Sequence, residues 1–236
     1  MMDPMEKNEY LLKLMLVLVR DRKAMQGRIR SVGYFREFGA LPDDMGVYTL
    51  SRLNDDEIVS LAESVGIGKR PANAKSDIYL NDLGYSFQFS AAAPLVLLPG
   101  VAREELHSVC RRVNVPVQRF DERIEEFWKL RMNAGIGEEV RISELPPQFQ
   151  DLQEWLYPVL EFFLFTGTEK GESPFPADYV FEYADPLNTN TWAIYDKKQT
   201  MELLRDQLWM RAKGESERDW VLHVQAKRET AAGRNS

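Results

Sequence analysis

The chain has 236 residues, a formal net charge of −7, 44% hydrophobic residues and 28% charged residues. These proportions are typical of a folded globular protein and exclude a largely disordered chain. The single Cys and two His residues exclude an intramolecular disulfide and argue against a zinc centre built from Cys and His. Any bound metal would therefore be held by carboxylates, which favour hard cations such as Mg²⁺.

The first residues do not match a secretory signal, because they are polar and acidic ahead of the first apolar stretch. The longest apolar run, residues 14–19, is too short to cross a bilayer. We therefore expect a cytoplasmic protein with no membrane partner.

Periodicity along the chain predicts an α/β (α+β) fold in one domain over residues 1–226, with a polar and disordered tail at residues 227–236. The expected helices cover residues 8–26, 55–65, 103–113, 121–132, 149–165 with an interruption at Pro158, and 200–212. The expected strands cover residues 78–80, 85–89, 179–183, 192–195 and 220–225.

Residues 74–90, AKSDIYLNDLGYSFQFS, are the most informative segment. Two apolar runs flank an Asn/Asp/Gly turn at residues 81–84, which predicts a β-hairpin. Ser86 and Gln88 share one face of the second strand, because side chains alternate along a strand. We expect the hairpin to bring Asp77, Ser86 and Gln88 together, with their polar tips on one side.

This segment resembles the metal-binding signature of the restriction-endonuclease-like, PD-(D/E)xK superfamily, in which an Asp is followed about ten residues later by a residue-x-Lys pair. Gln88 stands where that pattern has Lys. The phrase PANAKSDIYLNDLGYSF resembles type II restriction endonucleases in particular, and an acidic N-terminal helix with Glu6 and Glu9 suits the superfamily's order of elements. The resemblance implies a central mixed sheet flanked by helices, with Mg²⁺ held by Asp77 and with Ser86 and Gln88 completing the catalytic set.

The implied function is a Mg²⁺-dependent, sequence-specific endonuclease that hydrolyses double-stranded DNA, as a homodimer whose two sites cut both strands. A basic cluster leads directly into the signature, and we expect its members to contact DNA phosphates; they are Lys69, Arg70 and Lys75. Gln88 can hydrogen-bond a water but supplies no positive charge. We therefore expect slow or absent cleavage, with a gain in rate when Gln88→Lys restores the pattern.

Two other functions stay open. One is a catalytically silent protein of the same fold that serves as a DNA-binding or protein-interaction subunit. The other is an unrelated α/β binding protein, which the absence of a strand carrying Asp77 beside Gln88 would favour. The acidic net charge argues against general nucleic-acid binding, although basic residues can gather in one cleft. We interpret His107, Cys110 and His223 as structural residues.

Overall fold

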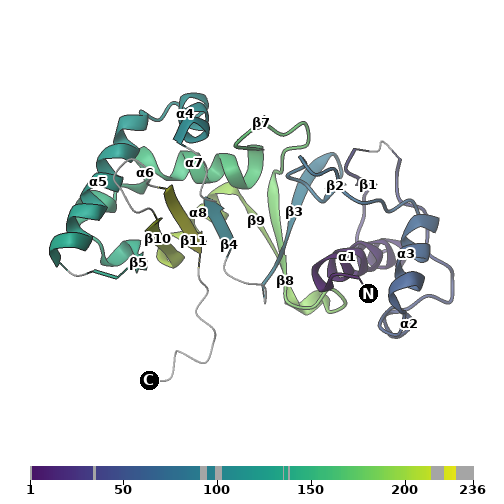
Figure 1. Cartoon of the computed structure of the whole chain (residues 1–236). Helices are drawn as coiled ribbons and strands as arrows, with labels where there is room; N and C mark the ends of the chain where they lie inside the picture. Colours follow the sequence, from purple (N-terminus) through teal and green to yellow (C-terminus); the bar gives the residue numbers. More distant parts are fainter. Residues whose placement is uncertain are drawn as a thin grey trace, which may run out of the picture. The chain divides into compact units, whose positions relative to one another are not determined.

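The computed structural model describes residues 2–33, 36–90, 95–98, 103–134, 136–137, 139–213 and 221–226. The chain divides into two compact units, Met1–Ala91 with Ser173–Lys197, and Ala92–Glu172 with Lys198–Ser236. Figure 1 shows that both units contain helices and strands, which confirms the predicted α/β class. The expectation of one domain over residues 1–226 stays a prediction, and the tail at 227–236 lies outside the described residues.

The first unit is built on a five-stranded mixed sheet with the strand order β1-β2-β3-β8-β9. These strands are β1 (Ile29–Ser31), β2 (Ile78–Leu80), β3 (Leu83–Phe89), β8 (Tyr179–Tyr183) and β9 (Trp192–Asp196). Every neighbouring pair is antiparallel except β3 and β8, which run parallel with Tyr85 opposite Tyr179. Parallel neighbours need a long crossover connection, and this one contains residues 92–172 of the second unit.

Helix α1 (Pro4–Asp21) packs its buried middle against this sheet. It begins where the Asp3 side chain accepts a hydrogen bond from the Met5 amide, 2.7 Å away, with Pro4 in the first turn. Every residue from 11 to 18 is buried, so α1 is covered on all sides over two turns. The short α2 (Val47–Leu50) and α3 (Asp55–Ser64) complete the helices of this unit, and a capping box opens α3.

The predicted hairpin is confirmed, with a tighter turn than expected. Asn81 and Asp82 have φ values of +50° and +69°, the left-handed backbone that two-residue hairpin turns require. The Asn81 side chain accepts a hydrogen bond from the Arg28 amide at 3.0 Å, and Asp82 pairs with Arg28 at 3.3 Å. Gly84 lies in β3 rather than in the turn. A Cβ at this position would collide with the Ser76 hydroxyl and the Pro176 carbonyl, so the position requires glycine.

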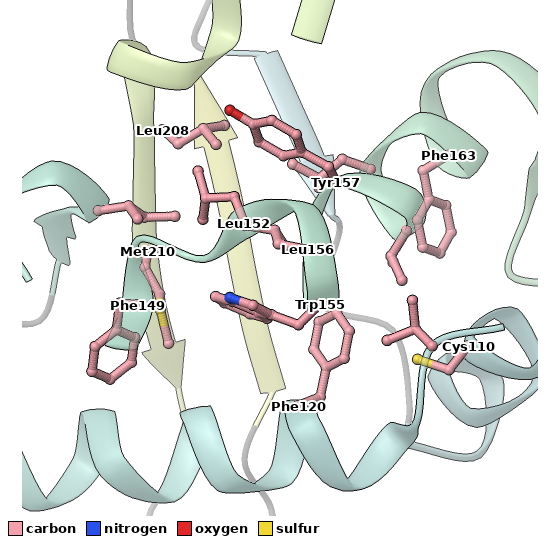
Figure 2. Close-up of a cluster of buried hydrophobic side chains, with 14 of the residues drawn as sticks. Cys110, Phe120, Phe149, Leu152, Trp155, Leu156, Tyr157, Phe163, Leu208 and Met210 are labelled. Atoms are coloured by element: carbon pink, nitrogen blue, oxygen red, sulfur yellow. The ribbon is translucent and has the colours of Figure 1, made fainter. Parts of the chain in front are cut away.

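The second unit holds a four-stranded antiparallel sheet in the order β4-β11-β10-β5. Its strands are β4 (Leu95–Leu98), β11 (Val221–Ala226), β10 (Leu208–Lys213) and β5 (Glu139–Arg141), and β6 (Gly167–Thr168) forms a separate pair with β7 (Gly171–Glu172). Its helices are α4 (Arg103–Arg112), α5 (Val117–Ala134), α6 (Leu152–Trp155), α7 (Tyr157–Glu161) and α8 (Lys197–Leu204). Figure 2 shows the core, where Phe120 packs edge-on against Trp155 with ring centroids 5.2 Å apart.

Two expectations in this unit need adjustment. The helix expected over residues 149–165 is interrupted as predicted, since α6 ends at Trp155 and Pro158 lies in the first turn of α7. The helix expected over residues 200–212 is wrong beyond Leu204, because residues 208–213 form β10. Leu208 and Met210 are both fully buried, the alternation of a strand with one face in the core.

The hairpin turn provides a stability test. Asn81→Ala places a Cβ-bearing residue without a polar side chain in the left-handed region and removes the hydrogen bond to Arg28. We expect the free energy of unfolding to fall by about 1–2 kcal/mol in urea titrations. Asn81→Gly, which keeps the backbone conformation, should lose less than half of that. Equal losses in the two variants would contradict the backbone explanation.

Candidate functional site

A pocket of about 470 Å³ lies in the first unit at the N-terminal half of α1. The loop that precedes β2 and the ends of β3 and β8 close its other sides. Its lining combines acidic, basic and aromatic side chains: Asp3, Met5, Glu6, Glu9, Tyr10, Lys69, Arg70, Ala72, Asp77, Phe87, Phe89 and Tyr183. The sequence-predicted Asp77 is therefore a pocket residue.

Asp77 lies directly before β2 and is held by its hairpin neighbour. Its amide donates a hydrogen bond to the Tyr85 carbonyl, 2.7 Å away, which extends the β2–β3 pairing by one residue. Its Oδ2 accepts a hydrogen bond from the Phe87 amide at 2.6 Å, and its Oδ1 lies 3.0 Å from the Arg70 guanidinium. The carboxylate is 4% exposed, so these contacts fix a buried group rather than a surface charge.

The surroundings of Asp77 set its protonation. Burial raises the pKa of Asp77 to about 6, and the Arg70 charge keeps that pKa from rising further. The Glu9 charge raises the same pKa and the Lys13 charge lowers it. Burial and the negative charges of Asp77 and Glu9 also raise the pKa of the Tyr183 hydroxyl. Buried groups with such shifts gather at functional sites.

The sequence interpretation missed Lys13. The Lys13 side chain is 1% exposed and its Nζ lies 2.6 Å from Oε1 of Glu9, one helical turn earlier. The signal in the sequence was a charged residue inside the apolar run from Leu11 to Leu18, where a surface helix would place lysine on a polar face. Glu9 was noted only as part of an acidic helix, and the structure places it in the same pocket as Asp77.

Ser86 and Gln88 are not brought to Asp77, so the unrelated α/β binding protein stays open as an alternative. Phe87 and Phe89 line the pocket, so strand alternation puts Ser86 and Gln88 on the opposite face of β3. The expectation failed because Asp77 precedes β2, and its carboxylate turns toward the Phe87 amide instead of following the strand's alternation. The Gln88 amide nitrogen lies 3.5 Å from the Phe89 carbonyl oxygen.

Two of the three predicted basic residues reach the pocket. Lys69 pairs with Glu6 at 3.2 Å, and its side chain is largely exposed. Arg70 is half-exposed while its guanidinium holds Asp77. Lys75 does not line this pocket; its amide donates a hydrogen bond to the Phe175 carbonyl at 3.0 Å.

The pocket offers oxygen donors that suit Mg²⁺. Within the described residues, no group of three or more His, Cys, Asp and Glu side chains is arranged to hold a metal. Mg²⁺ is commonly bound by one or two carboxylates together with substrate phosphates. Asp77 and Glu9 supply two carboxylates, and each carboxylate keeps acceptor positions beyond those used by Arg70 and Lys13. The donor set therefore fits an ion completed by substrate.

The remaining candidates keep their structural interpretation. Cys110 is fully buried in α4, and burial raises the pKa of its thiol to about 11, which disfavours the reactive thiolate. His107 lies one turn away in the same helix, and His223 lies in β11 opposite Arg211 of β10.

Comparison with known proteins found no matching family model, no matching curated protein and no matching solved structure. In the part of the chain that the structure covers, every helix falls short of the length or the apolar character that a bilayer crossing requires. The nuclease assignment and the cytoplasmic location stay predictions.

The raised pKa of Asp77 gives a pH test. Because the folded-state pKa, about 6, exceeds the ordinary value of Asp, ionisation of this carboxyl opposes folding. The stability that the protonated Asp77 carboxyl contributes is fully present below a pH of about 4, and it is lost as the pH rises through about 6. Relative to Asp77→Asn, the wild type should lose up to about 3 kcal/mol of unfolding free energy over that range. Urea titrations at each pH measure the difference, and parallel curves for the two proteins would contradict the assignment.

Proposed function

We propose that the Asp77 pocket is a phosphodiester-hydrolysing site and that the protein is a Mg²⁺-dependent endonuclease of double-stranded DNA. One observation carries the proposal: a buried carboxylate, held by two fixed contacts, lines a pocket that also contains three further carboxylates and two basic side chains. Phosphodiester hydrolysis needs both kinds of charge, because acidic groups hold the metal and basic groups bind the phosphates.

The acidic and basic side chains of the pocket have different roles in the proposed hydrolysis. When bound, Mg²⁺ would supply an activated water and neutralise charge on the phosphoryl oxygens. Asp77 and Glu9 would hold the ion, and the β2–β3 hairpin keeps Asp77 in place through the Phe87 amide. Arg70 and Lys69 are the exposed cations of the pocket and would bind the flanking phosphates.

The proposal includes cleavage at a specific DNA sequence by a homodimer. A single pocket of this kind hydrolyses one strand, so cutting both strands of a duplex at one position requires a second copy. The resemblance of residues 71–87 to type II restriction endonucleases supports both features. Ser86 and Gln88 lie outside the pocket, so the metal-binding part of the site reduces to Asp77 and Glu9.

The first test is cleavage itself. Purified protein should fragment phage DNA in Mg²⁺, and Asp77→Asn or Glu9→Gln should slow single-turnover cleavage by about 10²-fold or more, because each removes charge from the metal site. Glu63→Gln is the matched control, since Glu63 is an exposed acidic residue of α3 outside the pocket. Wild-type cleavage that survives Asp77→Asn would refute the assignment of this pocket.

A second candidate function is favoured by the ion pairs already present. The Asp77 carboxylate is bound to Arg70 and the Glu9 carboxylate to Lys13, so the free protein balances both negative charges. This arrangement supports a catalytically silent DNA-binding or protein-interaction subunit. Wild-type protein that binds duplex DNA but leaves it intact in Mg²⁺ and in Mn²⁺ would select this alternative.

DNA binding can be tested separately from cleavage. Lys69→Ala should weaken binding to any DNA sequence alike and reduce the slope of log affinity against log salt by about 1, because one phosphate contact is lost. Fluorescence anisotropy in Ca²⁺ at several salt concentrations measures both effects. Lys198→Ala is the control, because Lys198 is an equally exposed lysine paired with Glu202 on α8. An unchanged slope in Lys69→Ala would contradict the phosphate role.

A further inference from the structure

Lys13 is a buried charge that the proposed reaction has not yet used. Its side chain is 1% exposed, and its neighbours along α1 from residue 11 to residue 18 are all buried. An ammonium group carries three hydrogen-bond donors. Among the described residues, Glu9 is the one hydrogen-bond partner that the structure gives this group.

A role in helix stability does not explain this placement. Lysine pairs with glutamate four residues earlier on many exposed helices, where neither side chain is desolvated. Burying the ammonium is unfavourable, and replacing a buried ion pair as a whole by apolar residues of similar volume is often neutral or stabilising. Lys7 of the same helix makes the ordinary kind of contact, an ion pair with Asp55 between two partly exposed side chains.

The position of the Lys13 charge relative to the pocket is informative. Glu9 is 28% exposed and lines the pocket, while the lysine that binds its Oε1 is enclosed behind it. Asp77 lines the same pocket as Glu9, so Lys13 binds one of the two carboxylates that could hold the metal. No basic side chain reaches this site from β3, because residue 88 is a glutamine on the opposite face of the strand.

We propose that Lys13 is the positioning residue of this site: it binds one oxygen of Glu9 and thereby holds the Glu9 carboxylate beside Asp77. This inference rests on the proposed function, because the carboxylate pair has a purpose only if it binds a metal.

The test compares five variants in single-turnover cleavage of phage DNA. Lys13→Met should reduce the rate by about 10²-fold, and Lys13→Arg, which keeps the charge and the donors, should restore most of it. Lys7→Met is the matched control on the same helix and should leave the rate unchanged. If Lys13 acts through Glu9, the double variant of Glu9→Gln with Lys13→Met should be no slower than Glu9→Gln alone.

Metal binding provides the readout that a merely structural role would not give. Calorimetric titration of the free protein with Mg²⁺ alone should find that Lys13→Met binds the ion more weakly than wild type, because Glu9 is no longer held in place, and that Lys13→Arg restores the affinity. In a Glu9→Gln background, Lys13→Met should leave the Mg²⁺ affinity unchanged. Thermal unfolding of the same samples checks that each variant is folded during the titration.

Every outcome of this set decides something. Wild-type protein that does not cleave overturns the proposed function and this inference with it. Wild-type cleavage that Lys13→Met leaves intact overturns the inference alone. Losses of rate and Mg²⁺ affinity that Lys13→Arg does not rescue, or that recur in full in the Glu9→Gln background, would assign Lys13 to the fold and also refute the positioning role.

Discussion

The parallel pairing of β3 with β8 is the constraint on which the first unit depends. It joins residues 85–89 to residues 179–183 and aligns their aromatic side chains across the ladder. Tyr85 stacks on Tyr179 with centroids 5.1 Å apart, and Phe87 packs edge-on against Phe181 at 5.6 Å. Such cross-strand aromatic pairs contribute beyond the area they bury. The same pairing brings Tyr183 to the pocket that contains Asp77.

The charged side chains of the pocket come from three elements: a hairpin, a helix and a loop. Asp77 is fixed by the hairpin, Glu9 and Lys13 belong to the long helix α1, and Arg70 lies in a loop with a half-exposed side chain. Positive and negative charges alternate across these elements, so each buried charge has a partner. Buried charges persist only when they are paired in this way. Arg70 is the partner with the most freedom to move, because its side chain is the most exposed of the four.

The local features of this fold could be read from the sequence, and the long-range ones could not. The hairpin follows from Asn81-Asp82 and the alternation after it, and Asp77 is marked by its place before an apolar run. The strand β10 was mistaken for a helix because its assignment depends on pairing with β5 and β11. A segment of helical composition can form a strand when it pairs and packs with neighbouring strands.

In the candidate site, too, the local contacts could be predicted from the sequence and the long-range contacts could not. The pairing of Glu9 with Lys13 is a one-turn contact within a helix, yet its closeness to Asp77 depends on how α1 packs against the sheet. Alternation along β3 correctly predicts that Ser86 and Gln88 share a face. It does not predict the face of Asp77, because that residue precedes the strand and its side chain is directed by a hydrogen bond to the Phe87 amide.

The interleaving of the two units has a consequence for synthesis of the chain. Residues 92–172 are made after β3 and before β8, so β3 leaves the ribosome roughly 5–20 s before its parallel partner. During that interval the edge of β3, with Phe87 and Phe89, has no strand to pair with. Unpaired apolar edges promote association between nascent chains. The order of segments therefore leaves the β8-facing edge of β3 open to other chains until residues 179–183 have been made.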